Sequence, residues 1–157
     1  LRGLKQEQFL EDFQVNVIGA VQTLQANHKL LQAGAANGAK PGVVLFSTVA
    51  VGTGMPYHAS IAGAKGAVEG LTRTLAAEWA PAIRVNAIAP SLTDTSLAEP
   101  LLNSDAKRTA AAERHPAGRI ATADEVASLA AWLLSPASAS MTGQVLAVDG
   151  GMSSVRK

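Results

Sequence analysis

The chain has 157 residues, of which 48% are hydrophobic and 16% are charged, and its formal net charge of +1 is close to neutral. This size corresponds to one ordinary domain or a part of a larger one, while the composition excludes a disordered chain and the weak charge argues against nucleic acid and anionic membranes as partners. The absence of cysteine excludes a disulfide framework and a zinc–thiolate site and favours a reducing, cytoplasmic location, and no apolar run reaches the roughly 18 residues of a membrane span.

The spacing of apolar residues in the first part of the chain predicts a long helix followed by a short strand. Residues 7–31 keep helical spacing, and a loop rich in glycine and proline is expected over residues 34–42. The continuous apolar run over residues 43–47 is typical of a strand that is covered on both faces. A loop over residues 48–60 is expected to follow it.

The same alternation of helices and strands continues through the middle of the chain. Residues 61–79 form the clearest predicted helix, and residues 83–89 form a second buried strand. A turn over residues 90–95 leads into residues 98–114, which have a helical but polar pattern. This polarity is expected of a mobile flap.

The C-terminal part of the chain adds one helix and one strand. Thr122 and Glu125 have the spacing of a capping box at the start of a helix over residues 124–134, and residues 145–148 form a last strand. Helices that alternate with continuous apolar strands predict an α/β fold with a doubly wound parallel sheet. Ligands of such sheets bind beyond the carboxyl ends of the strands. Three strands are few for this architecture, so the chain is expected to be incomplete.

The predicted central helix has a lysine on its apolar side. Ile61, Val68, Leu71 and Leu75 form an apolar stripe, and Lys65 lies within it. One interpretation is a lysine that extends its charged head to water. The other is a cation held at a cleft, where it binds ribose hydroxyls or an anion, since a buried charge is costly without a partner.

Six segments of the chain, in this order, resemble the short-chain dehydrogenase/reductase family. The resemblance covers nearly the whole chain and corresponds to the second half of the family's Rossmann-like fold. It implies a single partial domain over residues 1–157, from which the N-terminal strands of that fold are absent. The segments are Asn16-Val-Ile-Gly19, Phe46-Ser-Thr48, Ala64-Lys-Gly-Ala-Val-Glu-Gly-Leu-Thr-Arg73, Ile83-Arg-Val-Asn-Ala-Ile-Ala-Pro90, Gly118-Arg119 with Asp124-Glu-Val-Ala127, and Thr142-Gly-Gln-Val-Leu-Ala-Val-Asp-Gly-Gly151.

The resemblance implies an oxidoreductase that transfers a hydride between NAD or NADP and the carbonyl or alcohol group of a small-molecule substrate. Family members use an Asn, a Ser, a Tyr and a Lys for catalysis. Asn16 and Lys65 match the first and the last of these, and the serine position falls on Thr48 or on its neighbour Ser47. Asn16 also has a purely structural interpretation, in which it interrupts or bridges its helix. Ser47 and Thr48 have one as well, in which their hydroxyls form hydrogen bonds to the backbone at the end of the strand.

The resemblance also implies which residues contact the cofactor. Besides Lys65, these are Pro90, Thr93 and Thr95 in the turn after the second strand, where Ser91 replaces the usual glycine. The structural alternative for residues 90–95 is a β-turn followed by the cap of the next helix. The phosphate-binding glycine loop that opens such folds is absent from the chain, and no metal site is predicted.

The family tyrosine is replaced, because Ile61 stands four residues before Lys65 and isoleucine exchanges no proton. The only tyrosine, Tyr57, lies in the preceding loop beside His58. Three hypotheses therefore stay open. The protein is an oxidoreductase of the usual type, or a catalytically silent member that acts as a cofactor-binding or interaction subunit. The third hypothesis is an enzyme of the same fold with different chemistry, such as reduction of an activated double bond, in which Ser47, Tyr57 or His58 replaces the missing acid.

The resemblance further implies an assembly. Family members commonly form dimers or tetramers through the two long helices and the last strand, so we expect a homodimer or a homotetramer. Residues 97–114 correspond to the family's substrate flap, but their side chains are too generic to indicate a substrate.

Overall fold

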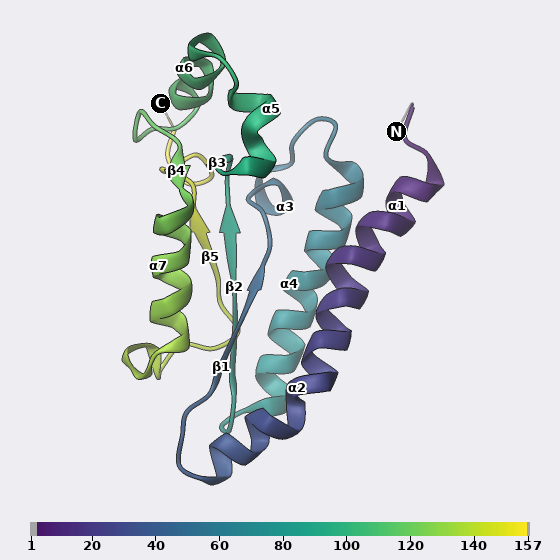
Figure 1. The fold of residues 1–157 in the computed structure, drawn as a ribbon, viewed down its shortest axis with the longest axis vertical. Helices are drawn as coiled ribbons and strands as arrows, with labels where there is room; N and C mark the ends of the chain where they lie inside the picture. Colours follow the sequence, from purple (N-terminus) through teal and green to yellow (C-terminus); the bar gives the residue numbers. More distant parts are fainter. Residues whose placement is uncertain (1–2, 157) are drawn as a thin grey trace.

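The computed structural model describes residues 3–156, whose central element is a parallel sheet with helices on both faces (Figure 1). Three strands lie in the order β1-β2-β5: β1 (Gly42–Phe46), β2 (Arg84–Pro90) and β5 (Val145–Val148). Helix α4 (Ala59–Trp79) covers one face of the sheet together with α1 (Gln6–Phe13) and α2 (Gly19–Ala36), and α7 (Ala123–Leu134) covers the other. The predicted α/β fold with a doubly wound parallel sheet is confirmed. Within residues 3–156, every helix is too short or too polar to serve as a membrane span.

The central strand β2 is buried along nearly its whole length. Successive side chains of a strand point to opposite faces of the sheet. Val85 and Ala87 accordingly pack in one core with Val68 of α4, while Ile88 packs in a second core with Leu133 of α7. Two covered faces are the physical reason for the continuous apolar run in this part of the sequence.

The long helix predicted over residues 7–31 is interrupted in the structure. It consists of α1 (Gln6–Phe13), the π-helical turn η1 (Gln14–Ile18) and α2 (Gly19–Ala36). A π-helical turn shifts the helical register without breaking the helix, so the spacing of apolar residues does not reveal it. Helix α2 also continues beyond the predicted end, and the loop that follows it is correspondingly shorter.

The buried face of α4 differs from the predicted apolar stripe. Ile61 and Lys65 lie beside this face and are half-buried. Short side chains bring the helix close to the sheet and to α1, so the larger apolar residues are displaced to its flank. The buried residues recur every four positions and are Ser60, Ala64, Val68, Thr72 and Ala76.

Short elements cover the carboxyl ends of the strands, at the top of the molecule in Figure 1. The prediction of one helix over residues 98–114 is wrong, because a Ser104-capped break divides the segment. The loop predicted over residues 48–60 likewise contains a helical turn. These elements are α3 (Ala50–Thr53), β3 (Thr93–Asp94), η2 (Ser96–Ala98), α5 (Glu99–Leu102), α6 (Asp105–Glu113) and β4 (Ala121–Thr122), which pairs with β3.

Both ends of α7 are closed by specific hydrogen bonds. At its start, the Thr122 hydroxyl accepts from the backbone N–H of Glu125 at 3.3 Å, and the Glu125 carboxylate accepts from the backbone N–H of Thr122 at 2.9 Å, which confirms the capping box. At its end, the buried guanidinium of Arg84 donates to the carbonyl oxygens of Leu133 at 2.7 Å and Ser135 at 3.2 Å. This cation satisfies carbonyl groups that have no partner within the helix. The 3-10 turn η3 (Pro136–Ser138) follows directly.

Candidate functional site

Lys65 lies next to the carboxyl end of β1. Its Nζ donates a hydrogen bond to the carbonyl oxygen of Phe46, the last residue of that strand, at 2.8 Å. Desolvation by partial burial lowers the pKa of Lys65 below its ordinary value. Asn16 lines the same groove, so the structure brings together the two residues that match the family's Asn and Lys.

Asn16 reaches this groove from the π-helical turn η1. Its Nδ2 donates to the carbonyl oxygen of Asp12 at 2.8 Å, which leaves its side-chain oxygen free of a protein donor among residues 3–156. The helix is therefore interrupted at Asn16, as the structural alternative predicts, and the same residue lines the groove. Such π-helical turns are frequent at functional sites.

The structure separates the two hydroxyls at the end of β1. Ser47 is buried, and its hydroxyl donates to the carboxylate of Glu69 on α4 at 2.8 Å; this carboxylate also pairs with Arg73. Thr48 instead lines a cavity, and its hydroxyl donates a long hydrogen bond of 3.5 Å to the carbonyl oxygen of Pro90. Of the two hydroxyls, only that of Thr48 faces the cavity.

This cavity has a volume of about 560 Å³ and lies beyond the carboxyl ends of β1 and β2, below α5 and α6. Its position is the one expected for ligands of parallel α/β sheets. The lining residues come from the loop before α4, from the turn after β2, from α5, from α6 and from the segment after β5: Thr48, Val49, Met55, His58, Ser91, Leu92, Leu101, Lys107, Ala110, Ala111, Arg114, His115 and Met152.

A hydroxyl–imidazole pair lines the cavity. The hydroxyl oxygen of Ser91 lies 2.8 Å from Nε2 of His115, and Nδ1 of the same ring lies 2.7 Å from the carbonyl oxygen of Ala111. Because a carbonyl only accepts, Nδ1 carries a proton; Nε2 accepts from the Ser91 hydroxyl when the ring is neutral and donates to its oxygen when the ring is protonated. The ring is 1% exposed, so its orientation is fixed.

The carboxylate of Asp149 belongs to the surroundings of this pair. Burial alone would raise the pKa of Asp149, but hydrogen bonds from Ser153 and from the backbone N–H of Gly151, together with the charge of His115, lower it below its ordinary value. Asp149 is therefore a stable anion beside the imidazole.

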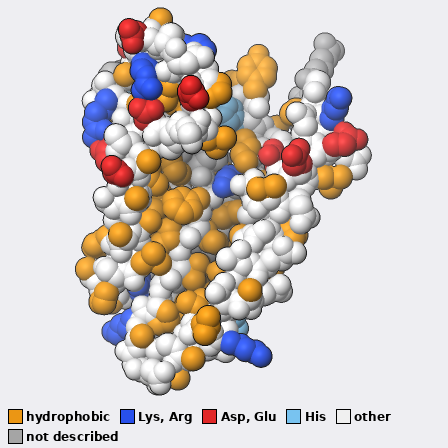
Figure 2. Space-filling view, in the orientation of Figure 1, with side chains coloured by type: hydrophobic (Ala, Val, Ile, Leu, Met, Phe, Trp, Pro, Cys, Tyr) orange, Lys and Arg blue, Asp and Glu red, His pale blue; other side chains and the backbone are white. Residues whose placement is uncertain are grey.

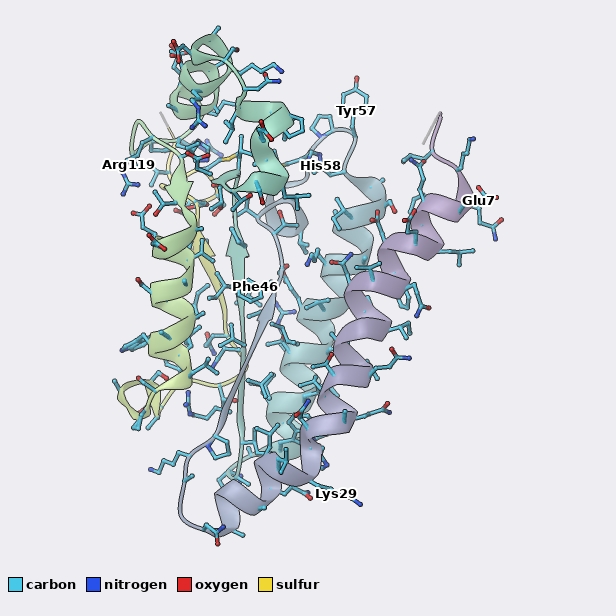
Figure 3. The ribbon with its side chains drawn as sticks, viewed as in Figure 1. Glu7, Lys29, Phe46, Tyr57, His58 and Arg119 are labelled. Carbon is cyan, nitrogen blue, oxygen red and sulfur yellow. The ribbon has the colours of Figure 1, made fainter. Side chains whose placement is uncertain are left out.

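The loop before α4 contributes His58 to the cavity but leaves Tyr57 outside it. His58 lines the cavity, and its Nδ1 lies 2.7 Å from the carbonyl oxygen of Pro56. Tyr57 is 100% exposed, and Figure 3 shows its ring pointing away from the molecule. Its φ of +65° is unusual for a residue with a side chain.

The turn after β2 holds the other predicted cofactor-binding residues. The Thr93 hydroxyl donates to the carbonyl oxygen of Ser91 at 3.1 Å, and the Thr95 hydroxyl accepts from the backbone N–H of Ala98 at 3.3 Å. The predicted cap is thus present at Thr95, at the start of η2. Pro90 ends β2, and its carbonyl oxygen accepts from the backbone N–H of Val49 at 3.2 Å.

Nothing in the sequence marks His115 as a candidate site residue. A lone histidine before Pro116 has no informative spacing, and its partner Ser91 is 24 residues away in the chain. The replacement of the family's glycine by Ser91 was the one available signal. For metals, the described part of the chain has no group of three or more acidic or histidine side chains that could hold an ion.

Comparison with known proteins agrees with the Rossmann-like class that the fold defines. A family model described as Enoyl-(Acyl carrier protein) reductase matches residues 1–153. A tropinone reductase homolog of Arabidopsis thaliana is 40% identical over 151 residues, which cover 93% of this chain and 55% of the relative. A 2,5-dichloro-2,5-cyclohexadiene-1,4-diol dehydrogenase of Sphingobium indicum is 36% identical over 151 residues, which cover 95% of this chain and 59% of the relative.

Solved structures give the same result. A gluconate 5-dehydrogenase from Burkholderia cenocepacia, in complex with NADP and tartrate, superposes with a TM-score of 0.88 at 30% identity, covering 98% of this chain and 59% of its own. A 3-ketoacyl-(acyl-carrier-protein) reductase from Brucella melitensis, complexed with NADH, has a TM-score of 0.84 at 32% identity, covering 96% and 60%. The chain belongs to the short-chain dehydrogenase/reductase family of oxidoreductases. It spans little more than half the length of the curated relatives it matches.

Proposed function

We propose that this protein is a nicotinamide-dependent oxidoreductase that transfers a hydride to or from the carbonyl or alcohol group of a small molecule. The observation that carries the proposal is the environment of Lys65. Its ammonium group is half-buried at the end of β1, holds the Phe46 carbonyl oxygen at 2.8 Å, and shares a groove with Asn16. An aliphatic residue would fill this position at a lower desolvation cost, so the charge has a function here.

The residues of this groove fit a nicotinamide cofactor, NAD or NADP. A lysine ammonium has three N–H donors, and the described residues use one of them, so two remain for the hydroxyls of a ribose. Pro90, Thr93 and Thr95 line the turn that would face the nicotinamide ring, and both threonine oxygens can still accept a hydrogen bond. When bound, the cofactor supplies or accepts the hydride.

The chain's own groups would orient the substrate and move its proton. The Thr48 hydroxyl, whose existing hydrogen bond is long, can turn to hold the substrate oxygen. The free side-chain oxygen of Asn16 can accept from a water molecule beside Lys65. Both functions correspond to the roles that the resemblance implies for these positions.

The acid that replaces the family tyrosine is, in this proposal, the Ser91–His115 pair. Ile61 has no proton to give, Ser47 is bound to Glu69, and Tyr57 is fully exposed. The Ser91 hydroxyl lines the cavity and can pass its proton to a substrate oxygen while Nε2 of a protonated His115 replaces it. In the opposite direction, neutral His115 accepts the proton through Ser91.

A catalytically silent, cofactor-binding subunit is the second candidate, and the replacement of tyrosine by Ile61 favours it. Titration with NADH and NADPH, followed by cofactor fluorescence, tests what both candidates share. We expect Lys65→Met to weaken cofactor binding at least about tenfold, since it removes hydrogen bonds from a charged donor. Lys29→Met, at an exposed position of α2, is the matched control. Wild-type protein that binds no cofactor would contradict both candidates.

A panel of ketones, alcohols and enones then separates the two candidates. Turnover of any ketone or alcohol supports the oxidoreductase. Stoichiometric cofactor binding without turnover of any member supports the silent subunit. Turnover confined to enones indicates reduction of an activated double bond instead.

We also infer that residues 1–157 are the C-terminal portion of a larger Rossmann-like domain, in a homodimer or homotetramer and in the cytoplasm. An uncovered hydrophobic band lies along the sheet between α7 and α2 (Figure 2), where Phe46 of the edge strand β1 is 46% exposed.

A second apolar groove between α2 and α4, lined by Leu24, Leu71 and Trp79, supports an interface between subunits. Sedimentation equilibrium of the intact protein tests the assembly, and a monomer would contradict it.

A further inference from the structure

The cavity beyond β1 and β2 is lined by cationic and imidazole groups without any acidic residue. Its charged or titratable lining residues are Lys107, Arg114, His58 and His115. The Arg114 side chain is exposed, and the described residues offer it neither an ion pair nor a hydrogen bond. Its positive charge is therefore available to a ligand.

The charge of Lys107 is also uncompensated. Its Nζ donates to the carbonyl oxygen of Pro100 at 2.9 Å and to the side-chain oxygen of Asn103 at 2.8 Å, and both acceptors are neutral. The neighbouring Arg108 differs, because it pairs with Asp94 at 2.8 Å and does not line the cavity. Of these two neighbouring cations of α6, Arg108 has an anionic partner and Lys107 has only neutral ones.

Lys107 and Arg114 lie on the same side of α6. They are seven residues apart, which is close to two helical turns, and Ala110 and Ala111 lie between them on the cavity wall. The two alanines leave the space between the cations free of large side chains. A guanidinium in such a position binds a planar carboxylate through two parallel hydrogen bonds.

The rest of the cavity is mainly apolar. Its larger apolar side chains come from the segment between β1 and α4, the turn after β2, α5 and the segment after β5, and its volume of about 560 Å³ is within the range of small-molecule sites. A ligand that fits both parts has an anionic end and an apolar body. The apolar lining residues are Val49, Met55, Leu92, Leu101 and Met152.

We propose that this cavity selects a small organic carboxylate, with its carboxylate held by Arg114 and Lys107 and its apolar body against Met55, Leu92 and Leu101. The inference rests on the proposed function only in taking this cavity as the substrate site. The substrate class is then an oxo or hydroxy carboxylic acid whose reacting oxygen lies near Thr48 and Ser91. A neutral ketone of the same shape leaves both cations without a partner.

Isothermal titration of the intact protein with phenylacetate and with its neutral isostere phenylacetamide tests the site. We expect phenylacetate to bind at least about tenfold more tightly than phenylacetamide. Arg114→Gln should remove most of this preference and Lys107→Gln part of it. Arg119→Gln is the matched control, since this exposed guanidinium lies at the outer edge of the molecule (Figure 3), pairs with Glu125 and does not line the cavity.

The outcomes separate this site from the proposed function. Equal affinity for acid and amide, or a preference that Arg114→Gln leaves unchanged, overturns the carboxylate site. Inorganic phosphate that binds as tightly as phenylacetate overturns the part of the proposal that concerns the apolar body. NADH and NADPH titrations of the same samples report on the cofactor independently, so a protein that prefers phenylacetate but binds no cofactor keeps the carboxylate site and loses the oxidoreductase.

Discussion

The hydroxyl oxygen of Ser91, in the turn that follows β2, lies 2.8 Å from Nε2 of His115, in the segment that follows α6. The backbone carbonyl of Ala111 holds the other ring nitrogen at 2.7 Å and so fixes which nitrogen faces the serine. The pair joins the sheet to the helices above the cavity. In the proposed mechanism this pair is the proton path into the cavity; its imidazole belongs to a residue that is 1% exposed, whereas His58 is half-buried.

Ser91→Ala is expected to lower kcat by about a hundredfold, because positioned acid–base groups contribute this much or more. The KM and the affinity for NADH or NADPH should change little, since neither Lys65 nor Arg114 moves. Steady-state kinetics on the substrates that the wild type accepts, with cofactor titrations beside them, measure this. Ser91→Thr retains the hydroxyl and should recover part of the rate. An equal loss in both variants would indicate a packing effect and would contradict the proton path.

Ile61→Tyr is expected to raise kcat at least about tenfold. Residues four apart on a helix are neighbours, so the new phenol would lie beside Lys65, whose positive charge lowers the pKa of a phenol. Ile61→Phe is the matched control, because it fills the same half-buried position without a hydroxyl. Tyr57→Phe should leave activity unchanged, since the native phenol is fully exposed. Equal rates for the Tyr and Phe variants at position 61 would mean that this side chain does not reach the substrate.

Arg84→Met is expected to lower the free energy of unfolding by about 3 kcal/mol, since several buried carbonyl groups lose a charged donor. Gly42 belongs to the same arrangement, because a Cβ there would lie 3.0 Å from a guanidinium nitrogen of Arg84 and 3.1 Å from the carbonyl oxygen of Leu133. Gly42→Ala should therefore destabilise the protein as well. Urea unfolding measures both variants. Arg73→Met, on the surface of α4, is the control and should change stability by about 0.5 kcal/mol or less. A similar loss at positions 73 and 84 would contradict the role of the buried arginine.

Much of the fold is predictable from the sequence, because hydrophobic burial sets the pattern of each strand. The apolar runs over residues 43–47, 83–89 and 145–148 correspond to strands within one residue at each end. The capping box at Thr122 depends only on local chemistry and is equally well predicted. The turn η1 is not predicted, because the spacing of apolar residues does not reveal a π-helical turn. The break at Ser104 is a local cap, in which its hydroxyl accepts from the backbone N–H of Lys107 at 3.3 Å, but the helical pattern continues across it.

Candidate site residues could be predicted from the sequence only where residues that are close in the chain also lie close together in the fold. The family resemblance, together with the spacing between Ile61 and Lys65, predicts the lysine and the replaced tyrosine without any structure, and the structure places Lys65 in one groove with Asn16. The choice between Ser47 and Thr48 depends on which face of the strand end meets Glu69, which sequence does not specify. The pairing of Ser91 with His115 joins two segments that only the folded chain brings together.

The pair of Glu125 and Arg119 makes stability depend on pH in the acidic range. Hydrogen bonds from Arg119 and from the backbone N–H of Thr122 lower the pKa of Glu125 from an ordinary value of 4.5 to about 2. Between these values the unfolded chain binds more protons at this site than the folded chain does, so the stabilising contribution is complete above about pH 4.5 and is lost as the pH falls through about 2.

The difference in the free energy of unfolding between wild type and Glu125→Gln should be constant at neutral pH and shrink across this window. Urea unfolding at a series of pH values measures it, and glutamine is the appropriate variant because its amide oxygen can still accept the capping hydrogen bond. In an Arg119→Gln background the same substitution should have a smaller and less pH-dependent effect, since the largest cause of the lowered pKa is removed. A difference that stays constant down to pH 2 would show that the bidentate contact between these exposed side chains does not persist in solution.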